Sequence, residues 1–255
     1  MTIVAVFNQK GGVGKTTTTL NLAATLARSG RTTYSIDLDP QAQLSSITGI
    51  TASSGDDTVL GLFKHNRLLR ELVRESASGI MVIPSHAELS KVDALFGKGY
   101  NVVNRLNTSL KSENFGNKDT PLIIDCCPMI GVLSLNAIFA CDCLIVPISA
   151  DHLSFKGAVQ IEKTLKALEQ VLKRRVKRRY LLTRFDSRRR MAWDVLHMIE
   201  EKFGSEVCRT RIAESVSLAE SPAVNKTVFE HSPNSRGAHD HDELLAELLA
   251  AGFIE

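Results

Sequence analysis

The strongest constraint on this chain is the glycine-rich stretch KGGVGKTT at residues 10–17, which follows an apolar run from Ile3 to Phe7. β-Forming residues, then glycines, then a Lys-Thr pair predict a strand, a loop and a helix whose backbone N–H groups face an anion. Nucleotide phosphate is the anion that fits. The standard phosphate loop, G-x-x-x-x-G-K-[ST], requires a glycine where this chain has Gln9. This loop instead holds two adjacent glycines and a second lysine, Lys10.

The residue types of the loop assign most of the nucleotide contacts. Lys15 is expected to meet the β- and γ-phosphates, and the Thr16 hydroxyl is expected to bind Mg²⁺. Asp125 ends the apolar run Leu122–Ile124, which places a carboxylate where a second magnesium contact is needed. The predicted contacts to the nucleotide and its Mg²⁺ are Gly11, Gly12, Val13, Gly14, Lys15, Thr16, Thr17 and Asp125. A single chain gives no role to Lys10, because Lys15 in the same loop already serves the phosphates and would repel it.

Two further carboxylates follow the second apolar run, in the segment Asp37-Leu38-Asp39-Pro40-Gln41. Alternate residues of a strand point the same way, so both carboxylates are expected on one side near the phosphates. The carboxyl ends of parallel strands are also where open α/β sheets bind ligands. Alternatively, Asp39-Pro40 simply begins a turn.

Apolar runs alternate with helical patterns along the whole chain. Strands are expected near residues 3–7, 32–38, 80–84, 122–125, 143–147 and 180–183, with long helices at 153–172 and 243–250. The polar segment Gly97–Thr120 allows a helix followed by a surface loop. This alternation predicts an α/β fold with a doubly wound, mostly parallel sheet. At 255 residues, without a repeat or a convincing linker, we expect a single domain over residues 1–255.

Composition excludes several classes of protein. Hydrophobic residues make up 44% of the chain and charged residues 23%, which is ordinary for a soluble globular protein. No stretch approaches the roughly 18 apolar residues that span a bilayer, and no signal peptide is visible, so the cytoplasm is expected. The five cysteines are odd in number and lack a paired zinc-binding spacing, so we interpret them as mostly buried thiols.

Charge is distributed unevenly. Residues 173–190 carry ten Lys or Arg and one Asp, while the net charge of the whole chain is only +3. A basic segment on an acidic body suggests a docking face for a polyanion. The alternative is a solvated charge run at the end of a surface helix.

The loop KGGVGKT resembles the "deviant Walker A" motif of the ParA/MinD family of ATPases. The resemblance extends over most of the chain and favours ParA. DLDPQ at 37–41 is similar to the ParA switch I, and DCCPMIGVLSLNAI at 125–138 to its switch II, although Cys127 replaces a usual proline. LLTRFDSRR from residue 181, and the region from Ile212 to Ala238, resemble the C-terminal third. The resemblance implies a P-loop NTPase fold of the deviant Walker type, without the N-terminal helix-turn-helix of larger plasmid proteins.

The resemblance also implies roles for individual residues. Lys10 corresponds to the signature lysine that reaches across a nucleotide-sandwich dimer to the partner's phosphates, which implies an ATP-dependent homodimer. Asp39 is implied to position water or metal for hydrolysis. The predicted catalytic residues are therefore Lys10, Lys15 and Asp39, and the predicted metal-binding residues are Thr16, Asp39 and Asp125.

DNA binding is a further implication of the resemblance. Arg188 occupies a family DNA-contact position, but Glu214 and Ser217 stand where chromosomal ParA proteins carry arginines. The basic segment could compensate, since non-specific binding is mostly phosphate neutralisation. The predicted DNA contacts are Lys173, Arg174, Arg175, Lys177, Arg178, Arg179, Arg188, Arg189 and Arg190.

These expectations favour a positioning ATPase, nucleoid-associated and cytoplasmic, that binds double-stranded DNA without sequence preference. A ParB-like or cargo adaptor would stimulate hydrolysis, which would be slow without it. One alternative is a MinD-like protein that cycles on a membrane, although the tail ELLAELLAAGFIE is acidic and short. Another is an iron–sulfur ATPase using Cys126 and Cys127, whose role the sequence leaves open.

Overall fold

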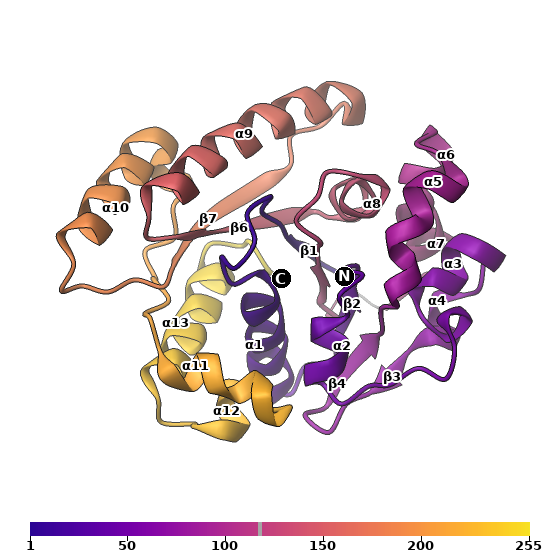
Figure 1. The fold of residues 1–255 in the computed structure, drawn as a ribbon, viewed down its shortest axis with the longest axis horizontal. Coiled ribbons are helices and arrows are strands. Elements are labelled where there is room, and N and C mark those ends of the chain that lie inside the picture. Colours follow the sequence, from indigo (N-terminus) through magenta and orange to yellow (C-terminus); the bar gives the residue numbers. More distant parts are fainter. Residues whose placement is uncertain (117–118) are drawn as a thin grey trace.

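The computed structural model describes residues 1–116 and 119–255, and within them a seven-stranded sheet forms the centre of the molecule (Figure 1). The strand order is β3-β4-β2-β5-β1-β6-β7; β3 pairs antiparallel with β4 and the other neighbours are parallel. The sheet confirms the predicted α/β, mostly parallel architecture. The strands are β1 Ile3–Val6, β2 Thr33–Asp37, β3 Arg74–Glu75, β4 Ile80–Ile83, β5 Leu122–Asp125, β6 Cys143–Ser149 and β7 Lys177–Thr183.

Helices connect the strands and cover both faces of the sheet (Figure 1). The α-helices are α1 Lys15–Arg28, α2 Gln43–Ile47, α3 Val59–His65, α4 Leu69–Leu72, α5 Val92–Phe96, α6 Tyr100–Val103, α7 Arg105–Ser112, α8 Val132–Ala140, α9 His152–Leu172, α10 Arg190–Phe203, α11 Val216–Glu220, α12 Val228–His231 and α13 Arg236–Ala250. Short 3₁₀ turns lie at Gly55–Asp57, Ala87–Lys91, Gly204–Glu206 and Ser221–Val224.

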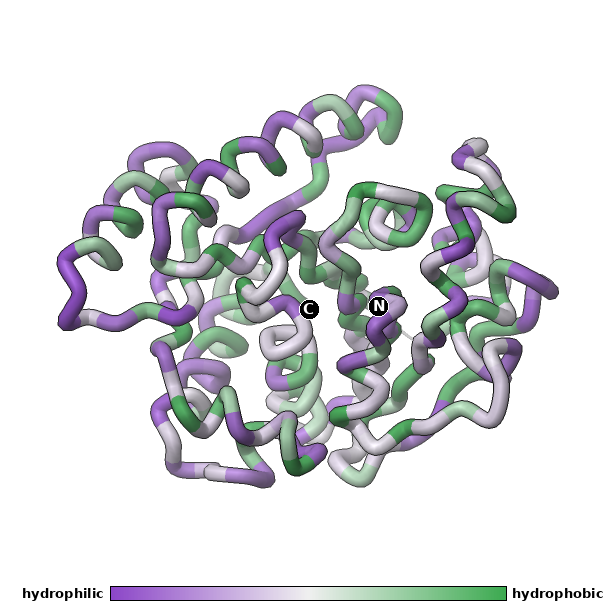
Figure 2. The backbone as a smooth tube through the Cα atoms, viewed as in Figure 1, coloured by the Kyte–Doolittle hydropathy of each residue, from purple (hydrophilic) through white to green (hydrophobic). Residues whose placement is uncertain are grey.

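Alternate residues of each strand feed two separate hydrophobic cores. In β1, Ile3 and Ala5 belong to the core shared with α8, α9 and α10, whereas Val4 and Val6 belong to the core shared with α1 and α13. This division follows from the period-2 geometry of a strand that is covered on both faces. Figure 2 shows the apolar residues gathered inside, while the connection from β7 to α10, at the left of the view, is strongly hydrophilic.

The structure extends two of the predicted elements. Strand β7 begins at Lys177 rather than near Tyr180, so that three basic side chains, Lys177, Arg178 and Arg179, also belong to the sheet. Helix α13 begins at Arg236, well before the expected Glu243. The predicted helix within Gly97–Thr120 is present as α6 and α7; Asn117 and Lys118 lie outside the described residues.

Candidate nucleotide-binding site

The glycine-rich loop lies between β1 and α1, at the carboxyl end of β1, which is an interior strand paired with β5 and β6. Gly12 and Gly14 adopt left-handed backbone angles, with φ of 71° and 86°, which side chains at these positions would strain. The loop is fixed to the sheet because the Thr183 hydroxyl donates a 2.9 Å hydrogen bond to the Val13 carbonyl. Next to the loop is a cavity of about 410 Å³, which extends from the loop past Asp39 to the segment Ile212–Ser215 and α13.

Lys15 is the buried cation of this cavity. Its side chain is largely enclosed, and its ammonium group donates a 3.1 Å hydrogen bond to the Lys10 carbonyl. Burial lowers the pKa of Lys15, whereas the nearby carboxylates of Asp125 and Asp39 raise it in part. A phosphate group at this position would give the ammonium a full counter-charge.

Asp125 and Asp37 form a buried acidic pair at the ends of adjacent strands, in register across β5 and β2. The Thr16 hydroxyl donates a 2.7 Å hydrogen bond to Asp125, which brings the two predicted magnesium contacts together. Burial, and then the charge of Asp37, raise the pKa of Asp125 well above its ordinary value. Burial also raises the pKa of Asp37 to about 6, despite two hydrogen bonds from Ser45.

Asp37 and Asp39 have different surroundings, contrary to the expectation that both carboxylates face the phosphates. Asp37 is fully buried, and it accepts hydrogen bonds from the Ser45 backbone and hydroxyl and from the Asp39 backbone at 2.7–3.0 Å. It therefore holds the following segment in place. Asp39 lines the cavity, and it also accepts a 2.9 Å hydrogen bond from the Gln41 backbone, so it begins a turn as well.

The residues that surround the cavity fit a magnesium nucleotide. The Thr16 hydroxyl and the carboxylates of Asp125 and Asp39 are hard oxygen donors of the kind that Mg²⁺ prefers. The raised pKa of Asp125 indicates that its negative charge lacks a sufficient counter-charge, which a divalent cation would supply. Lys15 and the loop backbone complete a set of donors for phosphate oxygens.

Lys10 is turned away from Lys15 and bound within its own chain. Its ammonium group lies 2.8 Å from Asp151 Oδ1 and 2.8 Å from the Ser154 hydroxyl, at the start of α9. Partial burial would raise the pKa of Asp151, but hydrogen bonds from Lys10 and Ser154 outweigh it and lower the pKa. The two lysines of the loop thus occupy separate environments.

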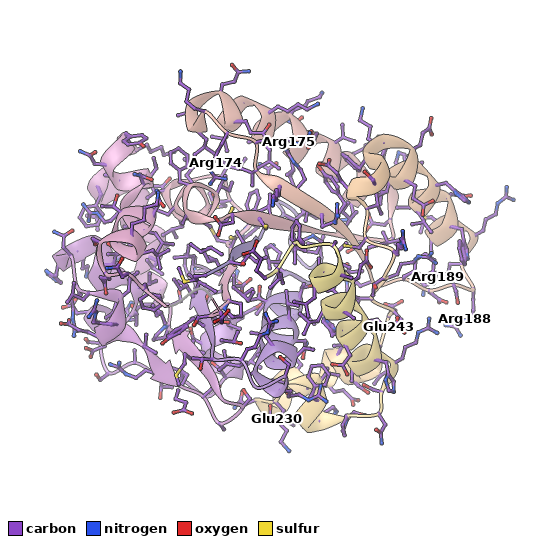
Figure 3. The ribbon with its side chains drawn as sticks, turned by 180° about the vertical axis from the view of Figure 1, so that it is seen from behind. Arg174, Arg175, Arg188, Arg189, Glu230 and Glu243 are labelled. Carbon is purple, nitrogen blue, oxygen red and sulfur yellow. The ribbon has the colours of Figure 1, made fainter. Side chains whose placement is uncertain are left out.

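The basic segment is divided between the two ends of β7, as the labelled arginines in Figure 3 illustrate. The first group, residues 173–179, lies at the amino end of the strand; the second, residues 184–190, follows its carboxyl end, near the cavity. Residues 180–183 lie between the two groups, so an extended chain places even their nearest members about 16 Å apart. The segment is therefore two surfaces and not one.

The first group is mostly engaged in contacts within the protein. Arg178 is 2% exposed and pairs with Glu162 at 2.9 Å and with Glu169. Arg174 donates to the Cys141 carbonyl at 2.7 Å, and Arg179 to the Ser205 carbonyl at 3.0 Å. The inclusion of Arg178 among DNA contacts was wrong in this structure, because alternation along β7 directs its side chain inward.

The second group is open to solvent. The side chains of Arg188 and Arg190 are 87% and 94% exposed, respectively. Arg188 makes a two-point contact with Asp186, and Arg189 lies 3.7 Å from Glu214. Glu214 therefore partly neutralises this surface.

Cys126 and Cys127 are buried, and all five cysteines are free thiols. Burial raises the pKa of Cys126 well above its ordinary value and that of Cys127 to about 11. Both thiols are therefore protonated at neutral pH and are not activated nucleophiles. The iron–sulfur alternative stays a prediction.

The arrangement of strand, phosphate loop, buried lysine and strand-end carboxylates defines a P-loop ATPase of the deviant Walker type. Solved structures share the fold. Cobyrinic acid a,c-diamide synthase from Mycobacterium smegmatis, with bound ATP analog and magnesium, has a TM-score of 0.84 and 26% identity over 99% of this chain and 96% of that one. The MinD protein from Pyrococcus horikoshii complexed with Mg-ADP has a TM-score of 0.77 and 20% identity over 100% and 98%.

Sequence comparison narrows the class. Residues 1–178 match the family described as "AAA domain". The chromosome-partitioning ATPase Soj from Thermus thermophilus is 33% identical over 97% of this chain and 95% of its own length. The chromosome partitioning protein ParA from Myxococcus xanthus is 31% identical over 97% and 87%. The chain belongs to the ParA/Soj family of deviant Walker ATPases.

Sequence reasoning missed several residues around the site. The partners of Lys10, Asp151 and Ser154, form a D-x-x-S pattern before a helix, which signals a helix cap but not an ion pair. His241 in α13 also lines the cavity, although it is far from the loop in sequence. The sequence carries no local signal for such a contact.

Proposed function

We propose that residues 1–255 act as a single ParA-type partition or positioning ATPase domain. ATP and Mg²⁺ drive formation of a sandwich homodimer, and the dimer binds double-stranded DNA without sequence preference. Hydrolysis of ATP to ADP and phosphate, slow in the isolated protein, is stimulated by a ParB-like or cargo adaptor and releases the DNA. Such a protein would work in the cytoplasm on the nucleoid.

The observation that carries this proposal is the separate placement of the two loop lysines. Lys15 is enclosed beside the phosphate site, so one chain already supplies its own phosphate-binding cation. Lys10 is half-exposed and held by Asp151 and Ser154, so its ammonium is free to exchange these partners for a phosphate of a second chain. Supplying a cation in trans is a known way of completing a phosphoryl-transfer site.

The remaining roles follow from the cavity. Thr16 and Asp125 would hold Mg²⁺, which neutralises the charge of the phosphates when bound. Asp39 lines the cavity and would orient the attacking water or contribute to the metal site. The buried Asp37 positions Asp39 through its backbone N–H and does not touch the nucleotide in this scheme.

Dimerisation can be tested by light scattering of the purified protein with Mg²⁺ and a non-hydrolysable ATP analogue. We expect a dimer for the wild type, and for Lys10→Ala a monomer that still binds the nucleotide. Lys163→Ala, an exposed lysine on α9, is the matched control and should dimerise normally. A dimer of unchanged affinity in Lys10→Ala would refute the trans role.

DNA binding can be tested by gel shifts with random-sequence duplexes. Binding should require ATP and Mg²⁺ and should weaken steeply with salt, because phosphate neutralisation supplies most of the affinity. Equal binding with and without ATP would overturn the proposed cycle. Measuring hydrolysis with and without DNA and adaptor then tests stimulation.

A membrane-cycling role of the MinD kind is the second candidate, but the C-terminal residues do not favour it. Phe253 and Ile254 are buried against the sheet, and no helix among the described residues is long and apolar enough to cross a bilayer. Sedimentation with anionic liposomes and ATP would reveal membrane binding directly.

A further inference from the structure

The backbone of Asp39 is held at both of its polar groups. Its N–H donates a 3.0 Å hydrogen bond to Asp37 Oδ1. Its carbonyl accepts a 2.5 Å hydrogen bond from the Ser85 hydroxyl and a 2.8 Å hydrogen bond from the Ala42 N–H. Asp39 lines the nucleotide cavity, whereas Asp37 and Ser85 are buried and do not line it. These bonds fix the peptide groups on both sides of Asp39, and so the direction of its side chain.

Strand register brings Ser85 to this position. Strands β2 and β4 are parallel neighbours, and Ile36 of β2 lies opposite Ile83 of β4. Ser85 follows Ile83 by two residues, so it comes level with the segment that leads from β2 to α2. It is 46 residues from Asp39 in sequence. The carboxyl ends of two neighbouring strands therefore supply Asp39 and the hydroxyl that holds it.

Ser85 is itself part of a closed ring of hydrogen bonds. Its N–H donates to the Ser45 hydroxyl at 2.9 Å, and that hydroxyl donates to Asp37 Oδ2 at 2.7 Å. The bonds from Asp39 to Asp37 and from Ser85 to Asp39 close the ring. Asp37, Ser45 and Ser85 are at most 6% exposed. Hydrogen bonds that are shielded from water and linked in this way strengthen one another, so the ring resists displacement.

The Asp39 side chain is less constrained than its backbone. One carboxylate oxygen, Oδ1, accepts the 2.9 Å hydrogen bond from the Gln41 N–H. The other, Oδ2, has no hydrogen bond or ion pair with any residue that the structure describes. A rigidly held backbone with one available carboxylate oxygen suits a group that holds a water molecule or a magnesium ion at a defined place. ATP binding depends on the phosphate loop, whereas the hydrogen bonds of Ser85 go to Ser45 and Asp39.

We propose that Ser85 is a positioning residue for ATP hydrolysis. Its hydroxyl holds the Asp39 carbonyl, and the backbone held in this way directs the Asp39 carboxylate at the attacking water or the metal. Ser85 thus affects the rate of hydrolysis without touching the nucleotide. The inference rests on the proposed function, in which Asp39 has this role, and adds to it a residue from a neighbouring strand. Because a slightly displaced catalytic group loses much of its effect, we expect loss of the hydroxyl to change kcat by about 10-fold.

Steady-state hydrolysis of ATP with Mg²⁺, together with titration of a fluorescent, non-hydrolysable ATP analogue, provides the test. Ser85→Ala removes the hydroxyl but keeps the N–H bond to Ser45, so kcat should fall about 10-fold while the Kd of the analogue changes by less than about twofold. Ser85→Thr keeps a hydroxyl and should retain most of the activity. Ser90→Ala is the matched control and should have the kcat of wild type, because the exposed Ser90 hydroxyl donates to the Ala87 carbonyl at 2.8 Å and not to Asp39.

An unchanged kcat in Ser85→Ala would overturn the inference, and so would a Kd that rises as much as kcat falls. Light scattering with the analogue checks for an indirect effect: Ser85→Ala should dimerise as the wild type does, and loss of the dimer would also overturn the positioning role. The failures are distinguishable. A wild type that binds the analogue but hydrolyses no ATP refutes the proposed function itself, whereas an active wild type with an equally active Ser85→Ala refutes only the role of Ser85.

Discussion

Both ends of strand β7 carry basic residues, but the two ends use them in opposite ways. At the amino end, Arg178 is buried between two glutamates and Arg174 is bound to a backbone carbonyl. At the carboxyl end, Arg188 and Arg190 extend into solvent. Charge density in a sequence therefore does not identify a binding surface. Whether a basic residue can bind a ligand depends on the side of the strand on which it lies and on the partners that it contacts.

The same contrast holds for stability. At the amino end of the sheet, the buried Arg178 is paired with carboxylates, and this pairing stabilises the folded state once the groups are buried. At the carboxyl end of the sheet, Asp37 of β2 and Asp125 of β5 are buried side by side, and their proximity destabilises the folded state. The amino end of the sheet thus stabilises the fold. The carboxyl end retains buried charges without full counter-charges, which is typical of a ligand-binding site.

The largest expected effect concerns Arg178. Replacing it with methionine leaves the partly buried Glu162 and Glu169 without their cation and should lower the free energy of unfolding by about 3–5 kcal/mol. Urea denaturation measures this change. Arg188→Met, at 87% exposure, is the matched control and should stay within about 0.5 kcal/mol of wild type. Adding Glu162→Gln and Glu169→Gln to Arg178→Met should restore most of the loss; equal effects of Arg178→Met and Arg188→Met would contradict the contrast.

The next effect is the pH dependence caused by Asp37. Its pKa of about 6 lies above the ordinary 3.8, so the folded state binds the proton more tightly. Stability should therefore fall as pH rises from about 4 to about 6, by up to about 3 kcal/mol, and the loss should be complete above pH 6. Denaturation of nucleotide-free protein across this range measures it. Asp37→Asn should show a flatter profile, and a profile identical to wild type would exclude this source.

DNA binding separates the two ends directly. Replacing Arg188 and Arg190 with glutamate should weaken ATP-dependent binding of random-sequence duplex DNA by about 10-fold or more. The slope of log K against log salt concentration should become shallower by about 2 per protomer. The matched control reverses Lys173 and Lys177, which lie at the amino end. If the control weakens binding equally or more, the DNA surface includes the amino end and the proposed assignment fails.

The smallest expected effect is a gain. Glu214→Arg removes the partner 3.7 Å from Arg189 and adds a cation to the carboxyl end. Affinity for DNA should rise several-fold, and the slope of log K against log salt concentration should become steeper by about 1 per protomer. Gel shifts at two salt concentrations measure this gain, and Glu201→Arg, an exposed residue on α10, controls for net charge. An equal gain in both variants would mean that net charge alone is responsible.

The sequence was sufficient to predict the parts of this molecule that depend on local pattern. The phosphate loop, the strand ending at Asp125 and the alternation of strands and helices each have a short-range signature, and the structure has them. Contacts that depend on strand register could not be predicted without the fold. Arg178 is buried because β7 starts at Lys177, and Asp37 faces inward because its oxygens bind Ser45.

Contacts between distant segments were equally beyond prediction. Lys10 meets Asp151 across more than a hundred residues, and His241 reaches the cavity from the C-terminal helix. Charge and spacing show that such residues need partners but not which ones, because the choice depends on how the strands are ordered in space.

The hydrogen bond from the Lys15 ammonium to the Lys10 carbonyl has a kinetic consequence. This bond gives the buried ammonium group an acceptor within its own loop, so the chain itself fixes the shape of the loop. Arrival of a phosphate then exchanges one acceptor for a stronger one and does not have to order a flexible chain. We therefore expect nucleotide capture to be fast, with a small entropic barrier. In the proposed cycle, we expect the association of two nucleotide-bound chains to be the slow step.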